Sequence, residues 1–491
     1  MNRTYADDSV ALHTDLYEIN MILTHWKKDN HHKKAVFEVY YRSNPFGMGY
    51  TIFAGLERIV RYIENLHFTE SDIQYLREVE GYPEEFLAFL KNWKFKGSLR
   101  SFKEGEVAFA NEPLIQVEGS IVDCQLIETA LLNIVNFQTL VATKAAQIKS
   151  AAGEDPVLEF GARRAQEMDA AIWGARATYI AGVDSTSNTR AAKIFGIPAS
   201  GTHAHALVQA YRDEYQAFKA YAETHKNCVF LVDTFNTLES GVPNAIKVAK
   251  EMGDKINFLG VRLDSGDLSY LSKRVRQQLD EAGYKEAKIF VSNDLDAETI
   301  QNLKMQGAKI DVWGVGTKMI TAYDQPALGA VYKIVSVEGN DGNMHHTLKL
   351  TGNAAKISTP GKKQVWRIRS HNDKKPEGDY ITLIDETPNE QEELFMFHPQ
   401  YTYINKTLTD YRARPLLQEI FVEGKRVYKL PKLEEIRMYA KDSLSEQWEE
   451  HKRLLNPEPY PVDLSQKLYD AKVETINLFK KIPNKESESL F

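Results

Sequence analysis

The chain has 491 residues, of which 43% are hydrophobic and 26% are charged, a composition typical of a globular protein with two or three domains. Its net charge of −7 argues against a general nucleic-acid-binding role, because neutralising phosphates requires a basic surface. The first residues carry Asp7, Asp8 and Asp15 where a secretory signal would be apolar, and no apolar run reaches the length of a membrane span. We therefore expect a cytoplasmic protein with no nucleic-acid or membrane partner.

The two cysteines, Cys124 and Cys228, lie in the apolar stretches VDCQLIETALL and KNCVFLVDTF. Apolar surroundings favour buried free thiols over a disulfide or a zinc site.

Residues 1–152 form the first predicted domain, an α/β unit whose sheet we expect later residues to complete. The spacing of apolar residues predicts helices within 71–93, whereas 105–120 is rich in strand-forming residues. A long apolar helix is predicted over 124–152.

Residues 153–328 form the second predicted domain, in which short β-type runs alternate with helical runs. Seven strands are predicted, beginning near PVLEFGARR, GVDSTSN, IPASGTHAH, CVFLVDTFN, FLGVRLDSGD, KIFVSNDLD and IDVWGVGTK. Each strand ends in polar or glycine residues, which is typical of an α/β barrel whose active face lies at the carboxyl ends of its strands. A doubly wound open sheet is the alternative. Residues 329–491 form a C-terminal α+β region, which we expect to pack partly on the first domain.

The segment FLGVRLDSGDLSYL places Arg262, Asp264 and Asp267 directly after an apolar strand. A guanidinium suits a carboxylate or a phosphate, and paired aspartates suit ribose hydroxyls or a magnesium ion. A surface turn closed by an Arg–Asp pair is the alternative.

Two other strand ends carry candidate ligand-binding residues. DVWGVGTKMI brings Gly314, Gly316 and Thr317 to the last strand of the series, with a helix predicted just after, an arrangement that suits an anion. EFGARRA contributes Phe160 and Arg163, which fit an aromatic anionic ligand. A glycine-rich turn and a core phenylalanine are the alternatives.

The stretch GTHAHALV holds His203 and His205, one residue apart. They could form a metal site, a catalytic pair, or a reactive histidine beside a bystander. Alternating positions of a strand point to opposite faces, which disfavours joint coordination of one ion.

Seven motifs together carry a family resemblance: TDLYEINM, NEPLIQVEG, EFGARRA, GTHAHALV, VDTFNT, GVRLDSGDL and DVWGVGT. In this order and at these separations they resemble nicotinate phosphoribosyltransferases. The resemblance covers about residues 10–330 and extends more loosely beyond.

The resemblance implies a type II phosphoribosyltransferase fold: a distorted, TIM-like α/β barrel, an N-terminal open-faced α/β sandwich and a further C-terminal region. It implies a homodimer with shared active sites. The implied reaction joins nicotinate to 5-phosphoribosyl 1-diphosphate, giving nicotinate mononucleotide and diphosphate for NAD salvage. ATP, a co-substrate, is hydrolysed through a phosphohistidine, so the enzyme is classed as a ligase. Mg²⁺ is implied, and no prosthetic group.

The resemblance also assigns residues. It implies that His205, three residues after Thr202, is the phosphorylated histidine and that His203 is a bystander. It implies nicotinate contacts from Thr202, Arg262 and Tyr17, the last from the other subunit, with Phe160 as the opposite wall of a ring sandwich.

For the other substrate, the resemblance implies a contact from Thr317 to 5-phosphoribosyl 1-diphosphate, in the same turn as Gly314 and Gly316. The chemistry makes Asp264 and Asp267 candidates for ribose or magnesium contact and Arg163 a candidate for phosphate contact, with no metal held by the protein alone.

Asp184, in GVDSTSN, is predicted at the end of the second strand. It fits a nicotinate substrate poorly, because an aspartate at a similar place in nicotinamide-using relatives accepts the substrate amide. A free carboxylate there would repel nicotinate. Nicotinamide phosphoribosyltransferase is therefore the close alternative. A non-catalytic dimeric binding relative is the alternative from another class, whereas GTHAH argues against a quinolinate-using enzyme.

Overall fold

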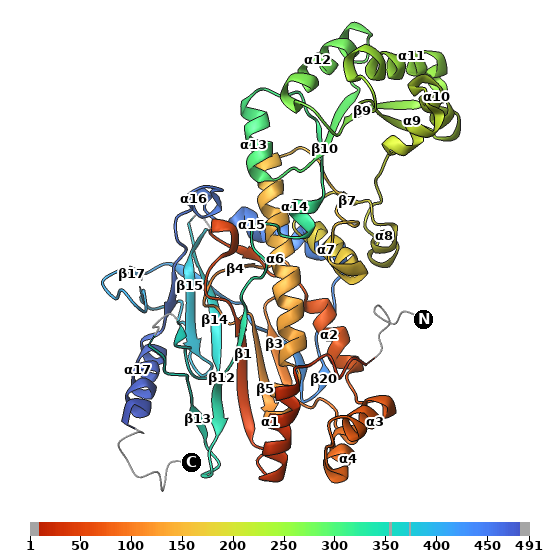
Figure 1. Ribbon diagram of the computed structural model, residues 1–491. Coiled ribbons are helices and arrows are strands. Elements are labelled where there is room, and N and C mark those ends of the chain that lie inside the picture. Colours follow the sequence, from red (N-terminus) through yellow and green to blue (C-terminus); the bar gives the residue numbers. More distant parts are fainter. Residues whose placement is uncertain (1–8, 353–355, 373–374, 482–491) are drawn as a thin grey trace. The chain divides into compact units, whose positions relative to one another are not determined.

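The computed structural model describes residues 9–352, 356–372 and 375–481, so Asp7 and Asp8 lie outside the described residues. The chain forms two compact units (Figure 1): Met1–Leu140 together with Ala327–Phe491, and Val141–Pro326. Helix α6 (Glu128–Ala152) begins in the first unit and ends in the second. The domain boundaries at 152 and 328 stay a prediction.

The first unit is organised around a seven-stranded sheet in the order β13-β12-β1-β5-β3-β19-β20. β1 (Lys34–Tyr40) is central and buried at every position after Lys34, as its apolar sequence KAVFEVY favours. Its neighbours are antiparallel. The other strands are β3 (Ser98–Ser101), β5 (Ile115–Ser120), β12 (Val331–Glu338), β13 (Met344–His346), β19 (Gln418–Val422) and β20 (Lys425–Arg426). One sheet thus joins the beginning, the middle and the end of the chain.

Further strands and helices complete the first unit. A four-stranded sheet has the order β18-β14-β15-β21, and two-stranded sheets pair β2 with β4 and β16 with β17. These strands are β2 (Thr51–Ile52), β4 (Val107–Ala108), β14 (Lys363–Ser370), β15 (Pro376–Leu383), β16 (Leu394–Phe397), β17 (Asn405–Leu408), β18 (Tyr411–Pro415) and β21 (Val462–Leu464). The helices are α1 (Leu16–Lys27), α2 (Leu56–Asn65), α3 (Glu70–Glu78), α4 (Glu84–Asn92), α5 (Ile121–Leu126), α15 (Leu433–Glu446), α16 (Glu449–Lys452) and α17 (Gln466–Lys481).

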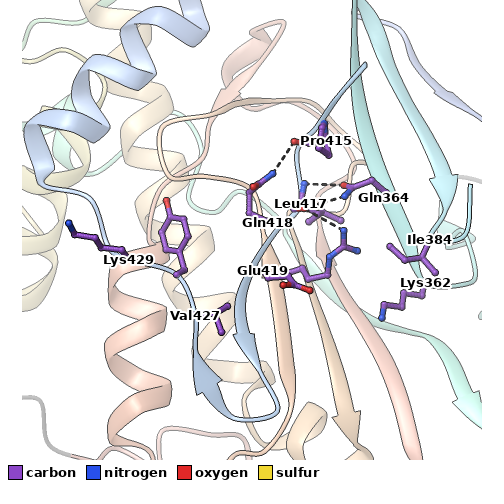
Figure 2. A pocket seen from close by; sticks show the side chains of 11 residues that line it. Lys362, Gln364, Ile384, Pro415, Leu417, Gln418, Glu419, Val427 and Lys429 are labelled. Atoms are coloured by element: carbon purple, nitrogen blue, oxygen red, sulfur yellow. Dashed lines mark hydrogen bonds between the residues drawn. The ribbon is translucent and has the colours of Figure 1, made fainter. Parts of the chain in front are cut away.

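A hollow of about 830 Å³ opens in the first unit (Figure 2). Polar and apolar side chains line it, including Arg100, Lys362 and Tyr428. The Gln364 side chain bonds the backbone of Leu417 in its wall. None of the site residues predicted from the sequence is among its lining residues.

The second unit contains a six-stranded parallel sheet in the order β7-β6-β11-β10-β9-β8. The strands are β6 (Val157–Glu159), β7 (Ser185–Thr186), β8 (Asn227–Leu231), β9 (Asn257–Leu263), β10 (Lys288–Asn293) and β11 (Val312–Val315). The helices are α7 (Glu167–Ile180), α8 (Thr189–Phe195), α9 (His205–Tyr211), α10 (Glu214–Thr224), α11 (Val242–Met252), α12 (Leu268–Glu281), α13 (Ala297–Met305) and α14 (Thr317–Ile320). All the strands therefore end at one edge.

The parallel sheet is a curled half-barrel, which corrects the expected barrel. The predicted third strand, IPASGTHAH, forms only an isolated bridge between Ala199 and Thr186. Pro198 in that segment lacks an N–H and cannot donate to a ladder. Among the described residues, β7 and β8 therefore stay edge strands, and the α/β class is confirmed without closure of the sheet.

His203 occupies the open edge beside β8. Its Nε2 accepts a hydrogen bond of 3.1 Å from the backbone N–H of Leu231. The backbone N–H of Val232 donates to the carbonyl oxygen of Arg262 on β9. Because consecutive N–H groups of a strand point to opposite sides, the N–H of Leu231 points away from β9. A seventh strand on that side would have accepted this hydrogen bond. His203 is buried, and its imidazole replaces a backbone carbonyl.

The helical stretch Ile121–Ala152 is long and apolar enough to cross a membrane, which corrects the expectation that no such run exists. However, 67% of its most apolar window is buried inside the protein. Burial of this kind is typical of a core helix. Cys124 and Cys228 are buried and free, as predicted.

Candidate active site

The carboxyl ends of β8, β9 and β10 bring polar side chains together. Asp233 follows β8, and its side chain is only 2% exposed. Its Oδ2 accepts hydrogen bonds from the backbone N–H of Asp264, at 2.8 Å, and from the Ser265 hydroxyl, at 2.6 Å. The hydroxyl of Ser292, on β10, donates to Asp264 Oδ1. Two carboxylates are thus held in place by neighbouring strand ends.

His205 lies beside these carboxylates. Its Nδ1 is 3.0 Å from the hydroxyl oxygen of Thr234. Its Nε2 is 3.8 Å from an oxygen of Asp233 and 3.8 Å from an oxygen of Asp264. The side chain is 35% exposed, so one ring is both oriented by the protein and open to a ligand. His205 is the first residue of α9 rather than part of a strand, which corrects the predicted strand context.

His203 differs from His205 in its burial and in its hydrogen-bond partners. Burial is the main cause that lowers the pKa of His203 to about 4, and the charges of Arg262 and His205 contribute to the same shift. An imidazole that accepts a backbone N–H at Nε2 is neutral with its proton on Nδ1. The two histidines therefore do not converge on one ligand.

Arg262 and Thr202 form a direct pair at the end of β9. Nη1 of Arg262 donates to the Thr202 hydroxyl. Burial lowers the pKa of Arg262, while Asp264 and Asp233 raise it, and a guanidinium stays charged under such shifts. Its Nε is buried and has no hydrogen-bond partner among the described residues. The arrangement leaves a donor that a bound carboxylate could use.

Phe160 packs against the glycines of β11 and the following turn. A Cβ at Gly314 would lie 2.8 Å from two ring carbons of Phe160, and a Cβ at Gly316 would lie 3.1 Å from the Phe160 carbonyl oxygen. Position 314 therefore requires glycine, because any side chain there would collide with the Phe160 ring. The half-buried Thr317 opens α14, which has only four residues, so the predicted helix contributes little dipole at this turn.

Two other predicted contacts are more exposed. Asp267 caps α12, where its Oδ1 accepts a 2.9 Å hydrogen bond from the Tyr270 N–H. Arg163 is exposed, and its charge reaches Arg262 and lowers the pKa of that group. Asp267 therefore has a structural role as a helix cap, and Arg163 remains accessible to a ligand.

Asp184 lies at the other end of the sheet, which corrects its predicted place at a strand end. It precedes β7, and its Oδ2 accepts from the Val157 N–H, at 2.9 Å, where β6 begins. Lys149 lies 3.3 Å from the same oxygen. The carboxylate is neutralised at the amino edge, opposite the edge that holds His205.

Tyr17 belongs to the other compact unit. It is the second residue of α1, 48% exposed, and its hydroxyl donates to Glu128 at 3.4 Å. Burial raises the pKa of Tyr17, as do Glu128 and Glu18. The phenol is therefore neutral and partly open.

Three residues of this cluster were not predicted from the sequence as site residues: Asp233, Thr234 and Ser292. Asp233 and Thr234 follow the apolar run CVFLV directly, in a motif that already carried the family resemblance. Polar residues directly after a buried strand indicate a candidate site, so this position could have identified Asp233 and Thr234. Ser292 lies within FVSND, and nothing local distinguishes it from a surface serine.

Comparisons with known proteins cover most of the chain. Three protein-family models match the chain. The nicotinate phosphoribosyltransferase N-terminal domain matches residues 12–136, the nicotinate phosphoribosyltransferase family matches residues 156–372, and the C-terminal domain matches residues 362–472. The chain is 58% identical over 484 residues to nicotinate phosphoribosyltransferase of Bacillus subtilis, covering 99% of each chain.

Solved structures agree with the sequence comparison. Human nicotinic acid phosphoribosyltransferase matches with a TM-score of 0.83 at 30% identity, covering 94% of this chain and 99% of that chain. Nicotinate-nucleotide pyrophosphorylase from Pyrococcus furiosus matches with a TM-score of 0.67 at 26% identity, covering 89% and 95%. Sequence, fold and the cluster around His205 lead to one conclusion: this chain belongs to the nicotinate phosphoribosyltransferase family.

Proposed function

We propose that the chain joins nicotinate to 5-phosphoribosyl 1-diphosphate, giving nicotinate mononucleotide and diphosphate for NAD salvage. The observation that carries the proposal is the position of His205 against Asp233, Asp264 and Thr234, beside the Arg262–Thr202 pair. Family membership supports the same reaction.

The glycosyl transfer needs alignment rather than a strong base. The pyridine nitrogen attacks the anomeric carbon while the carbon–oxygen bond to diphosphate breaks, through a cationic sugar of the kind common to glycosyl transfers. Arg262 binds the nicotinate carboxylate, and Phe160 stacks on the ring, so that nitrogen and carbon meet in line. Thr202, Asp267, Arg163 and the turn from Gly314 to Thr317 complete the proposed substrate contacts.

His205 serves the ATP-dependent part of the cycle. One ring nitrogen attacks the γ-phosphorus of ATP, a nitrogen–phosphorus bond forms, and the bond to the ADP oxygen breaks. Thr234 holds the ring at Nδ1 in the orientation that this attack requires. Hydrolysis of the phosphohistidine then returns the free imidazole.

The carboxylates near His205 fit a magnesium ion. Asp264 is 39% exposed, and Oδ1 of Asp233 is buried with no hydrogen-bond partner among the described residues. Hard oxygen donors are the ligands that Mg²⁺ prefers, and when bound with diphosphate the ion would neutralise charge on the leaving group. Asp233 and Asp264 would hold it.

Nicotinate is favoured over nicotinamide as the substrate. The feature that fitted nicotinate poorly was Asp184, and its carboxylate bonds Val157 and pairs with Lys149 at the amino edge of the sheet. Arg262, by contrast, suits a carboxylate. We also propose a cytoplasmic homodimer in which Tyr17 reaches the nicotinate of the other subunit.

Labelled ATP tests the proposal directly. In the wild-type protein, acid-labile phosphate from γ-labelled ATP is expected on His205, and nicotinate is expected to release diphosphate much faster than nicotinamide. The His205→Ala variant should lose the label and the stimulation by ATP while retaining slow transfer. The His203→Gln variant is the control and should keep the label. Label on the His205→Ala protein would refute the assignment, and wild-type protein without diphosphate release would indicate a non-catalytic relative.

A further inference from the structure

The turn between α1 and β1 gathers three potential metal ligands. Asp29, His31 and His32 each offer one ligand atom, and these atoms all lie within 4.8 Å of one another. The turn is remote in sequence from the strand ends that form the candidate active site, and the proposed reaction uses none of the three.

The distances fit an ion better than hydrogen bonds. Asp29 Oδ1 lies 3.8 Å from His31 Nδ1 and 3.7 Å from His32 Nδ1. Hydrogen bonds of this type end near ~3.2 Å. A tetrahedral ion with bonds of ~2.0–2.2 Å separates its ligand atoms by roughly 3.4 Å. The three atoms therefore surround a space of about the size that one ion needs.

His31 supplies an observation that itself points to a ligand. Its Nδ1 is buried and has no hydrogen-bond partner among the described residues. The ring packs edge-on against Phe89, with centroids 5.4 Å apart and planes at 76°, so its direction is fixed. Buried polar atoms are rarely left without a partner. A bound cation would satisfy this nitrogen.

The backbone of the turn presents Asp29 in an unusual place. The Asn30 N–H donates to His25 at 2.9 Å and the Asp29 N–H donates to Trp26 at 3.1 Å, the two bonds of a Schellman motif that closes α1. Asp29 has a φ of 53°, at the position that glycine or asparagine usually fills. An aspartate here keeps a carboxylate where the backbone alone would favour another residue.

Both attractive and repulsive charges act on a cation at this turn, where lysines flank the three ligands. The C-terminal end of a helix carries partial negative charge, and Asp29 follows that end directly. The ammonium of Lys33, the nearest lysine after the ligands, is bonded to Asn340 Oδ1 at 2.7 Å. This hydrogen bond directs the ammonium to an oxygen outside the cluster, although its positive charge still opposes a bound cation.

We propose that Asp29, His31 and His32 bind a divalent transition-metal ion of the zinc class. Two imidazoles and one carboxylate suit Zn²⁺, whereas Mg²⁺ and Ca²⁺ prefer oxygen ligands alone. The fourth position faces solvent, because Asp29 is 88% exposed and His32 is 63% exposed, and it takes water. The ion ties the end of α1 to the start of β1 and stabilises the first unit.

Zinc titration of the full chain tests this site. The calorimetric titration uses Zn²⁺ as the only titrant, in a buffer with excess Mg²⁺ that occupies oxygen-only sites. Compared with the wild type, His32→Asn and Asp29→Asn are expected to lose one equivalent of Zn²⁺ or to bind it at least about tenfold more weakly, since even second-shell changes cost that much. Asp29→Asn retains the backbone, because asparagine tolerates this φ.

The matched control is His371→Asn, which removes a histidine 3.8 Å from a single aspartate, Asp410. It should bind Zn²⁺ as the wild type does. Zn²⁺ should raise the melting temperature of the wild type and the control, but not of the two ligand variants. With Co²⁺ as the probe, an intense visible absorption of tetrahedral geometry is expected in the wild type and the control, but not in the two ligand variants. Wild-type stoichiometry and affinity in both ligand variants, or a Co²⁺ spectrum that they share with the wild type, would overturn the proposal.

Discussion

Glu18 is a single residue whose charge state the fold controls. It lies in the first turn of α1, fully buried, next to Tyr17. Burial and, to a smaller extent, the charge of Glu128 raise its pKa from the ordinary 4.5 to about 8. The carboxyl is therefore protonated in the folded protein at neutral pH, immediately beside the tyrosine proposed to reach nicotinate.

This shift predicts a pH-dependent stability. Between about pH 4.5 and pH 8 the unfolded chain ionises Glu18 while the folded chain keeps the proton, so the free energy of unfolding falls as pH rises through that window. Glu18→Gln has the same shape and cannot ionise. Its stability relative to wild type, measured by urea unfolding at pH 5 and pH 8, should increase with pH. Parallel profiles for the two proteins would contradict the buried proton.

At the residue scale, the sequence could predict chemical type but not every location. His205, Arg262 and Thr202 came from motifs, and the structure brings them into one cluster. Asp184 was misplaced because β7 begins at Ser185, and one residue decides at which edge of a parallel sheet a side chain lies. Ser292 was missed because its contact with Asp264 depends on two strands far apart in sequence.

At the scale of elements, six of the seven predicted strands of the second unit are present. Apolar runs followed by polar residues predict such strands well, because each strand is buried locally and repeats the same pattern. The failure is the segment around Pro198, where composition resembles a strand but the backbone lacks a donor. The imidazole of His203 then accepts the hydrogen bond of the Leu231 N–H, which lies on the unpaired edge of β8 and is buried.

The contribution of the hydrogen bond between His203 and the Leu231 N–H to the free energy of unfolding can be measured. His203→Leu should leave the Leu231 N–H buried without an acceptor and lower the free energy of unfolding by about 1–3 kcal/mol. His203→Gln offers an amide oxygen and should recover part of that loss. Chemical denaturation followed by circular dichroism gives both values. A leucine variant as stable as the wild type would mean that the hydrogen bond contributes nothing.

At the scale of the whole molecule, the proposed shared active site predicts complementation between inactive variants. Tyr17→Ala and Arg262→Ala proteins should each be nearly inactive, because each of their sites lacks one nicotinate contact. When the two are unfolded together and refolded at equal amounts, about half of the dimers should be mixed, each with one intact site of two, so that the mixture recovers about a quarter of wild-type activity. Diphosphate release is the measurement. Mixtures no more active than either variant would indicate that each subunit builds its site alone.

The arrangement of the first unit could not be predicted from local sequence. Periodicity shows that 34–40 and 331–338 favour strands, but carries no information on which strands pair. The partners Ala35 and Val337 lie 302 residues apart in the chain. Only their burial in one sheet decides the pairing, and burial is a property of the complete fold.

The central position of β1 also has a consequence for the order of synthesis. β1 leaves the ribosome well before β12, yet one of its two edges is closed only by β12, after residue 330. Until then the chain carries a strand with free backbone donors and acceptors and an apolar sequence, which is a template for aggregation. The second unit, Val141–Pro326, is translated entirely within that interval. A nascent chain that stalls at its end would therefore present an unpaired β1 edge, which makes this interval the one in which a growing chain most needs a chaperone.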